Sequence, residues 1–301
     1  MRVVSIDVRA IKACVLAGVL VGVWAGSWVP AGAYGRDAAV SVRPSTVRAS
    51  YYLALGDSVA VATGTTAYPY RLLKAYRRKL RGLRLDDIAV PGATTSSMLD
   101  SQYRTALGFL QAHRRRVALI TIDIGGNDVA GCFGPGGVNA ACFSAGLAKI
   151  KRNLTRMLTG FHKAAAGVPV IGMNYYNPFL GYWLAGGPFR SFALSTVSTS
   201  KALNRELTAI YGGTKKIADV QGRFRSTDLR NFVPSPWGDV PIAVDRACSW
   251  LDIQCHQGAP EGFGLDPNPA GERAIASAFE RAIGPLCDPG PSPAHKHCAE
   301  G

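Results

Sequence analysis

Three short segments place residues suited to catalysis directly after apolar runs of the chain. They are residues 56–58 (Gly-Asp-Ser), 91–95 (Pro-Gly-Ala-Thr-Thr) and 125–128 (Gly-Gly-Asn-Asp). Ser58 offers a hydroxyl nucleophile, Gly92 leaves backbone N–H groups accessible, and Asn127 offers a neutral amide donor. Acyl transfer requires this set, because a serine attacks the carbonyl carbon and the oxygen that becomes negative must meet donors aimed at it. Losing one such donor typically costs about 3–4 kcal/mol of transition-state stabilisation.

Alternating strand and helix patterns are needed to bring these segments together. Apolar runs predict strands and helical spacing predicts helices; we expect strands over 51–55, 87–90, 117–124, 168–173 and 216–220, and helices over 68–80, 147–166, 195–211 and 269–283. Such alternation is typical of a doubly wound α/β sandwich with a mostly parallel sheet between helices. Ligands bind such sheets at the carboxyl ends of the strands, so the three segments should converge there.

In this order the three segments resemble those of the SGNH, or GDSL, hydrolase superfamily, and the resemblance covers residues 51–283. Ser58 stands at the position of the family's nucleophile, Gly92 at that of its oxyanion-hole glycine and Asn127 at that of its oxyanion-hole asparagine. The resemblance implies a flavodoxin-like three-layer fold, with the Ser58 and Gly92 N–H groups and the Asn127 side chain holding the oxyanion. It implies a carboxylic ester hydrolase (esterase or lipase) that needs no metal or organic cofactor. The closer likeness is to secreted actinobacterial esterases and lipases with three local disulfides.

The catalytic base is the point at which the chain departs from this family. The family carries it as the histidine of His-Pro-Asn-x-x-Gly before the final helix, whereas here Asp266 precedes Pro267 and Asn268. Reference pKa values of about 6.5 for His and 3.9 for Asp make the base weaker by up to roughly 3.5 kcal/mol. We expect Asp57 to brace the nucleophile turn and Asp266 to act as a substitute base. His256 is the alternative base if its loop folds over the site, although a surface histidine beside a disulfide is the simpler interpretation.

Two other consequences of this substitution stay open. The protein can be a catalytically impaired relative that binds acyl, acetylated-sugar or anionic envelope ligands, or it can have lost activity without gaining a new role. The intact Ser58, Gly92 and Asn127 favour a working esterase or a binding protein over the third outcome.

The segment 177–184 (Asn-Pro-Phe-Leu-Gly-Tyr-Trp-Leu) is apolar and aromatic, and it follows the predicted strand 168–173. Two interpretations carry equal weight: an acyl-chain pocket or lid at the catalytic end of the sheet, and a loop packed within the core. Phe232, Trp237 and Trp250 would extend the same aromatic surface.

The N-terminus has the pattern of a secretory signal peptide. A basic start, the apolar run 13–29 and a small-residue cleavage pattern at 30–33 follow one another. We therefore expect a signal peptide over 1–33, a linker over 34–50, and a hydrolase-like domain over 51–301 that ends in a flexible C-terminal tail. A protein exported in this way would be secreted.

Six cysteines remain after the signal peptide, and an even number in an exported chain favours disulfides. They form three close couples, separated by 10, 7 and 11 positions: Cys132 and Cys142, Cys248 and Cys255, Cys287 and Cys298. The sequence leaves the connectivity open, and local pairing is the simplest choice. Because Cys-x-x-Cys is absent, we expect no zinc or other metal site.

The chain of 301 residues is strongly basic, with a formal net charge of +14, and 48% of its residues are hydrophobic. Such an apolar content excludes a disordered protein. Without residues 1–33 the balance is 31 − 19 = +12, which would give weak attraction to an anionic cell envelope. For the basic run 71–84 we favour the alternative, the solvated face of a helix, and no nucleic-acid-binding motif accompanies the charge. We expect a monomer whose partner is a small-molecule ester or a lipid.

Overall fold

The computed structural model describes residues 50–61, 66–113, 115–134, 137–213, 216–253, 255 and 264–286. All of them belong to the second of two units of the chain, residues 46–301. Several predictions lie outside the described residues and stay predictions: the signal peptide, the linker up to residue 49, His256, the couple Cys287 and Cys298, and the C-terminal tail.

A five-stranded sheet, all of its strands parallel, lies at the centre of the fold in the order β2-β1-β3-β6-β7. Its strands are β1 (Tyr51–Gly56), β2 (Arg84–Asp87), β3 (Val117–Asp123), β6 (Val170–Met173) and β7 (Ile217–Ala218). The chain moves from β1 to β2 on one side and then crosses to β3 on the other side, so a topological switch point lies between β1 and β3. This order confirms the predicted doubly wound α/β class.

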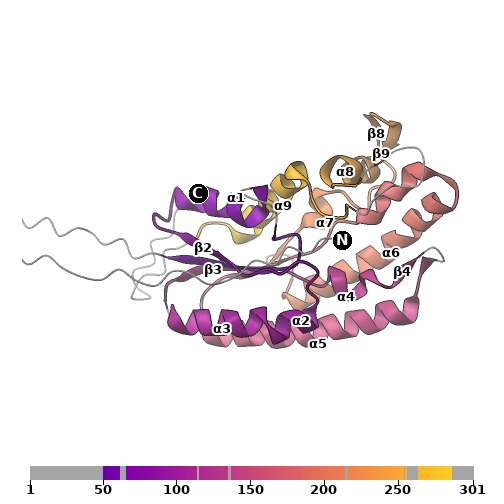
Figure 1. Cartoon of the computed structure of the whole chain (residues 1–301). Helices are drawn as coiled ribbons and strands as arrows, with labels where there is room; N and C mark the ends of the chain where they lie inside the picture. The colour runs from indigo at the N-terminus through magenta and orange to yellow at the C-terminus, as the bar shows by residue number, and fades with distance from the viewer. Residues whose placement is uncertain are drawn as a thin grey trace, which may run out of the picture. The chain divides into compact units, whose positions relative to one another are not determined.

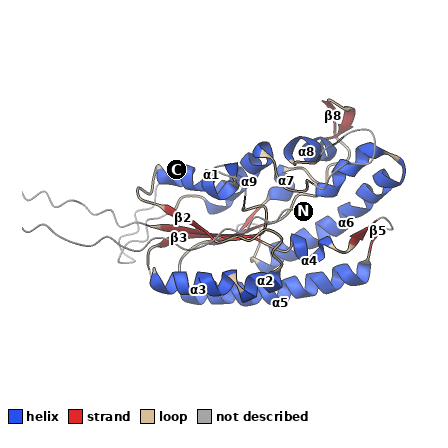
Figure 2. Cartoon of the chain, in the orientation of Figure 1, coloured by secondary structure: helices blue, strands red, loops and turns tan. Residues whose placement is uncertain are grey.

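Helices cover both faces of the sheet and complete three layers (Figures 1 and 2). One face carries α2 (Thr95–Asp100), α3 (Gln102–Ala112) and α5 (Ala140–Ala164). The opposite face carries α1 (Tyr68–Arg77), α7 (Val220–Arg223), α8 (Ile242–Trp250) and α9 (Pro269–Ile283). Beyond the carboxyl ends of the strands lie α4 (Gly126–Ala130), α6 (Gly187–Ile210), the 3₁₀ helix η2 (Pro178–Ala185), and the hairpins β4 (Phe133–Gly134)–β5 (Gly137–Val138) and β8 (Phe232–Ser235)–β9 (Gly238–Pro241).

The inner strands are buried on both faces, whereas the edge strand β2 is not. Every residue of β3 is buried, as expected for a strand covered by helices on both sides. The prediction of a strand over 87–90 is wrong: β2 covers Arg84–Asp87, and its charged side chains are tolerated because an edge strand is partly exposed. The apolar residues after it still run beside β1, since the N–H groups of Ile88 and Val90 donate to the carbonyls of Ala54 and Gly56.

Helix α9 occupies the predicted residues, but two long helices begin earlier than predicted. Helix α5 begins at Ala140 instead of residue 147, because Asn139 caps it by accepting the N–H of Cys142. Helix α6 begins at Gly187 instead of residue 195, with Pro188 in its first turn, where proline is favoured. Both first turns are mostly exposed, so apolar periodicity alone does not mark them.

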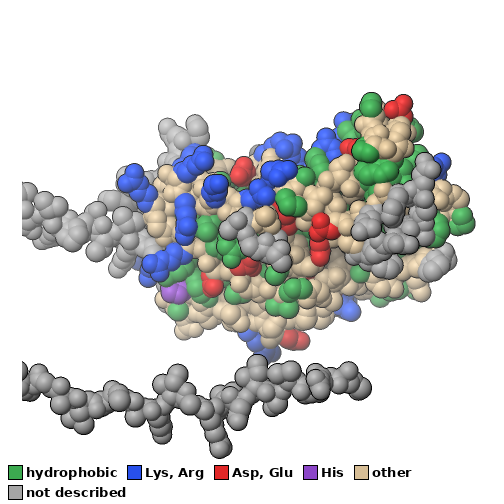
Figure 3. Space-filling view, turned by 45° about the horizontal axis from the view of Figure 1, so that its top comes forward, with side chains coloured by type: hydrophobic (Ala, Val, Ile, Leu, Met, Phe, Trp, Pro, Cys, Tyr) green, Lys and Arg blue, Asp and Glu red, His purple; other side chains and the backbone are tan. Residues whose placement is uncertain are grey.

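The basic run 71–84 lies largely on the solvent side of α1 and in the turn after it, as predicted. Its exposed members are Lys74, Arg77, Arg78, Lys79, Arg81 and Arg84. Figure 3 shows Lys and Arg side chains in several groups over this face of the molecule. Within the part of the chain that the structure describes, no helix is long and apolar enough to cross a membrane.

Candidate active site

The carboxyl ends of β1 and β3 bring Ser58 and Asn127 into one pocket. Ser58 follows β1 directly, and Asn127 lies in the first turn of α4, which follows β3. Asp266, from the segment before α9, lines the same pocket, whose volume is about 260 Å³. Three residues that the sequence places up to 208 positions apart therefore share one cavity.

The Ser58 hydroxyl donates a hydrogen bond to Asp266, with 2.7 Å between Oγ and Oδ1. This is the separation expected between a nucleophile and the base that takes its proton. Asp266 is therefore within proton-transfer distance of Ser58, and its role as a base stays a prediction. The described histidines lie elsewhere: His113 stacks against Tyr51 at the amino end of β1, and His162 is in the last turn of α5.

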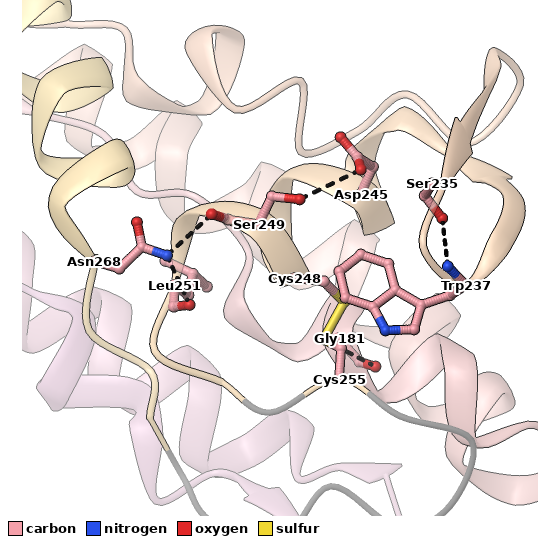
Figure 4. The surroundings of a disulfide bond; sticks show 9 residues. All are labelled: Gly181, Ser235, Trp237, Asp245, Cys248, Ser249, Leu251, Cys255 and Asn268. Atoms are coloured by element: carbon pink, nitrogen blue, oxygen red, sulfur yellow. Dashed lines mark hydrogen bonds between the residues drawn. A yellow bond between two sulfur atoms is a disulfide. The ribbon is translucent and has the colours of Figure 1, made fainter.

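Contacts with the end of α8 fix the segment that carries Asp266 (Figure 4). The Asp266 carbonyl accepts the N–H of Asp252 at 2.9 Å. Asn268 donates through Nδ2 to the carbonyls of Ser249 and Leu251, and its Oδ1 accepts the first free N–H groups of α9. The side chain of Asn268 therefore joins the end of one helix to the start of the next.

Gly271 allows the first turn of α9 to approach the end of α8. A Cβ at this position would lie 2.2 Å from the carbonyl oxygen of Trp250, closer than atoms can approach. Asn268 and Gly271 thus have packing roles of their own, which accounts for their presence whether position 266 is His or Asp.

Asp57 braces the turn that presents Ser58, as predicted. Its Oδ1 accepts the N–H of Val59 and its Oδ2 accepts the hydroxyl of Tyr175, each at 3.0 Å. The carboxyl is almost fully buried, and this burial raises its pKa to about 6, although both hydrogen bonds act in the opposite direction.

A second buried carboxyl, Asp123, lies directly beneath the same turn. Its Oδ2 accepts the N–H of Asp57 at 3.1 Å and its Oδ1 accepts the hydroxyl of Tyr68 at 2.6 Å. Gly56 is needed here, because a Cβ at that position would lie 2.1 Å from Oδ1 of Asp123. Burial, followed by the charge of Asp57, raises the pKa of Asp123 well above its usual value. The sequence offers one sign that Asp123 is buried: it is an acidic residue near the end of the otherwise apolar run 117–124.

Glu272, in the first turn of α9, is a third buried carboxyl. Its Oε2 accepts the N–H of Tyr68 at 2.6 Å. Burial raises its pKa to about 8, against the opposing effects of this hydrogen bond and of the charge of Arg71. Because Tyr68 also donates to Asp123, it links the nucleophile turn to the helix that follows Asp266. Sequence reasoning missed this link, since an acid in the first turn of a helix is usually exposed.

The Asn127 side chain is oriented so that one donor is free. Its Nδ2 donates to the carbonyl of Ala93 at 3.0 Å, and an amide nitrogen carries two N–H groups. Asp128 accepts both the N–H and the hydroxyl of Thr95 at 2.7 Å, which fastens the 91–95 and 125–128 segments together.

Gly92 lies in the turn beyond β2, beside the Ala93 carbonyl that holds Asn127. Its φ of +74° belongs to the left-handed region that glycine adopts without strain, and the residue is exposed. It is not part of the pocket lining. The backbone N–H groups of Ser58 and Gly92 donate to no other residue in the described part of the chain, and their role in an oxyanion hole stays a prediction.

One wall of the pocket is apolar and aromatic. The ring of Phe133 lies 4.6 Å from that of Phe179 and 6.2 Å from that of Phe143, measured between centroids. The pocket also meets hydroxyls of Thr196 and Thr199 on α6, but both donate to carbonyls one turn earlier in that helix. Much of the hydrogen-bonding capacity of this wall is therefore satisfied within the protein.

The aromatic segment 177–184 is divided between the pocket and the core, and its binding of an acyl chain stays a prediction. It forms η2, from which Pro178 and Phe179 line the pocket. The remaining apolar side chains of the segment are largely packed into the core: Leu180, Tyr182 and Leu184 are buried. Three aromatic residues do not extend the pocket as expected, because none of them lines it: Phe232, Trp237 and Trp250.

Two of the predicted disulfides are formed, Cys132–Cys142 and Cys248–Cys255. The first closes the β4–β5 hairpin that carries Phe133. The second ties the end of α8 to the chain beside Gly181 of η2 (Figure 4). Among the described residues, no group of His, Cys, Asp and Glu side chains is arranged to hold a metal ion.

A serine that donates to a candidate base beside a free amide donor, at the edge of a parallel sheet, matches the layout of serine-dependent hydrolases, except that Asp266 stands where these enzymes ordinarily carry a histidine. Comparison with protein families agrees with this class. The model of the GDSL-like Lipase/Acylhydrolase family matches residues 54–274, and the chain belongs to this family of carboxylic ester hydrolases. No curated protein sequence matched the chain.

Comparison with solved structures finds similar chains at low sequence identity. The lipase Lip_vut3 from a goat rumen metagenome is 19% identical with a TM-score of 0.51, over 78% of this chain and 97% of its own. The phospholipase A1 of Streptomyces albidoflavus NA297 is 18% identical with a TM-score of 0.49, over 77% of this chain and 98% of its own. At such identities the lipase comparison establishes the fold alone.

Proposed function

We propose that the protein is a secreted serine ester hydrolase, an esterase or lipase, that acts on carboxylic esters with short or medium acyl chains. The observation that carries this proposal is the hydrogen bond from Ser58 to Asp266 inside a pocket that Asn127 also lines. Membership of an ester hydrolase family supports the same reaction class.

In the first half of the reaction, Ser58 Oγ attacks the ester carbonyl carbon while its proton passes to Asp266. The carbonyl oxygen becomes negative and is stabilised by the free N–H of Asn127 and by the N–H groups of Ser58 and Gly92. The intermediate then collapses: the C–O bond to the alcohol breaks, and the alcohol takes the proton from Asp266. In the second half, water attacks the acyl ester on Ser58, Asp266 accepts the water proton and returns it to Ser58, and the carboxylic acid leaves.

The buried carboxyls beneath the nucleophile turn favour this chemistry when they are neutral. A negative charge close to Ser58 would oppose the negative charge that develops on the oxyanion. Burial raises the pKa values of both Asp57 and Asp123, which lowers the charge of the pair. Asp266 is exposed and hydrogen-bonded to the serine. Of these three carboxyls, it is therefore the one that can take the Ser58 proton and pass it to the leaving alcohol.

The dimensions and lining of the pocket support the proposed substrate class. Its volume of about 260 Å³ lies just below the usual range of ligand pockets, about 300–1,000 Å³, which favours a small acyl group. The wall of Phe133, Phe143 and Phe179 suits an acyl chain, and the threonine hydroxyls of α6 are already engaged.

We further propose export to the cell exterior and activity as a monomer without a cofactor. The signal-peptide pattern at residues 1–33 supports export. The two local disulfides support an oxidising compartment and a place among secreted esterases of the three-disulfide, actinobacterial type.

Hydrolysis of p-nitrophenyl esters of graded acyl length tests the function. Wild-type protein should turn over the shorter esters, and Ser58→Ala should lose at least about a thousandfold in kcat. Ser195→Ala is the matched control, because this exposed hydroxyl donates only within α6 and lies outside the pocket lining. Full activity in Ser58→Ala would refute the nucleophile. An inert wild type combined with an active Asp266→His variant would favour the binding-protein alternative.

A further inference from the structure

A second hollow, with a volume of about 790 Å³, lies among β7, α7, α8 and α9. It shares no lining residue with the pocket of Ser58. Four of its nine lining residues are arginines and one is acidic, Asp219. The arginines come from different parts of the fold: Arg223, Arg225, Arg246 and Arg281.

Carboxylates within the protein balance only part of this positive charge. Asp219 caps α7 and accepts hydrogen bonds from Asn174 and from the N–H of Gly222. Asp228 pairs with Arg225, while hydrogen bonds from Asn231 are the main cause of its lowered pKa. With Asp245 beside Arg246, three carboxylates face four guanidinium groups.

The cluster is electrostatically strained around Arg246. Burial lowers the pKa of its guanidinium, the nearby Asp245 opposes this effect, and the like charges of Arg223 and Arg225 lower the pKa further. Such mutual repulsion is relieved when an anion occupies the space between the charges.

Two of the guanidinium groups, those of Arg246 and Arg223, are held in place by contacts that leave donors unused. Arg246 stacks on the ring of Trp250, with 3.9 Å between Cζ and the ring centroid, a contact that uses the face of the guanidinium. Arg223 donates through Nη2 to Ser277 at 3.1 Å, but its buried Nε–H meets no partner in the described part of the chain. The guanidinium groups of Arg246 and Arg281 make no hydrogen bond within the described part of the chain, so a ligand that accepts hydrogen bonds would be stabilised here.

We propose that this hollow binds the phosphate group of an anionic ligand through Arg223, Arg246 and Arg281. A guanidinium fork matches the geometry of phosphate oxygens, and several forks around one group suit a dianion better than a singly charged carboxylate. The hollow is larger than a phosphate, so it leaves room for the remainder of a phosphorylated molecule. Because it opens to the surface, the phosphate can belong to a soluble compound or to a lipid headgroup.

Calorimetric titration of the purified protein with inorganic pyrophosphate tests the soluble source. Arg223→Gln and Arg281→Gln should each weaken binding about tenfold, as expected for the loss of a charge-assisted hydrogen bond. Arg104→Gln is the matched control, because it removes an exposed positive charge from α3, on the opposite face of the sheet. Added salt should weaken binding, because the site is open to solvent.

Co-sedimentation with phosphatidylcholine vesicles, with and without phosphatidic acid, tests the lipid source. Vesicle binding that requires phosphatidic acid and is lost in Arg281→Gln assigns the phosphate to a lipid headgroup. Pyrophosphate binding by wild type that is lost in Arg281→Gln assigns the phosphate to a soluble ligand. Arg281→Lys keeps the positive charge but loses the planar guanidinium that can donate two parallel hydrogen bonds. It should therefore bind more weakly than wild type in whichever of the two assays detects binding. Thermal unfolding shows whether each variant is folded; Arg281 is exposed, so its variants should unfold like wild type.

Two results would overturn the proposal. One is binding in neither arm by folded wild-type protein. The other is an equal loss of binding in Arg104→Gln and in the hollow variants, which would mean that only overall charge matters.

Discussion

Replacing Asp266 by asparagine separates proton transfer from every other function of this side chain. Asparagine keeps the shape and an oxygen that can accept the 2.7 Å hydrogen bond from Ser58, but it cannot take the proton. General-base assistance contributes about 10²–10⁴-fold, so kcat should fall by this factor, equivalent to about 3–5 kcal/mol of activation free energy. KM should change little, because the aromatic wall of Phe133, Phe143 and Phe179 is untouched.

Steady-state hydrolysis of p-nitrophenyl butyrate gives kcat and KM separately for this comparison. Asp252→Asn is the matched control: it removes the same charge nearby, while Asp252 holds Asp266 through its backbone N–H. Its kcat should stay close to that of wild type. An equal kcat for Asp266→Asn and Asp252→Asn would refute the assignment of the base. If His256→Ala then abolished activity, the base would move to His256.

Three other changes test separate parts of the structure. Burial raises the pKa of Glu272 to about 8 from an ordinary 4.5, so the contribution of this carboxyl to stability is full below pH 4.5 and is lost as the pH rises through 8. Glu272→Gln should remove on the order of 5 kcal/mol of this pH dependence of the free energy of unfolding in urea, and an unchanged pH dependence would contradict the assignment. Replacing Cys132 and Cys142 together by serine should lower the free energy of unfolding by about 2.5 kcal/mol, because the disulfide restrains a loop of the unfolded chain whose ends are 10 positions apart. An unchanged urea midpoint would count against a formed disulfide. Phe179→Trp should shorten the longest p-nitrophenyl ester hydrolysed, because a larger ring fills the apolar wall; an unaltered chain-length profile would place the acyl chain elsewhere.

The segments that carry Ser58 and Asn127 were predictable because each follows a buried strand. Alternation of strands and helices sets a parallel sheet, and the carboxyl ends of its strands meet at one edge. The position of Asp266 followed from the register of Pro267 and Asn268, residues that the structure uses to join α8 and α9.

Some shorter elements could not be predicted from the sequence: helices α2, α3 and α8 and the hairpin β8–β9. Their apolar residues are too few to show a clear helical or strand period. The edge strand β2 was misplaced for a related reason, since its charged residues hide the strand pattern.

The buried carboxyl network was missed for an electrostatic reason. Asp and Glu are usually exposed, so a pattern assigns them to the surface. Asp123 and Glu272 are instead buried and both are bonded to Tyr68, a pairing that only the folded chain reveals. The hydrogen bond between Ser58 and Asp266 likewise depends on the fold, because it joins the start of the domain to its end.

The most direct test of the central claim is covalent labelling of the protein with a fluorophosphonate, followed by mass spectrometry of its peptides. The reagent reacts with an activated serine, which displaces fluoride from phosphorus. One adduct is expected, on Ser58, that is absent in Ser58→Ala and forms much more slowly in Asp266→Asn. Failure of the wild-type protein to react, or an adduct on a different residue, would contradict an activated serine at position 58.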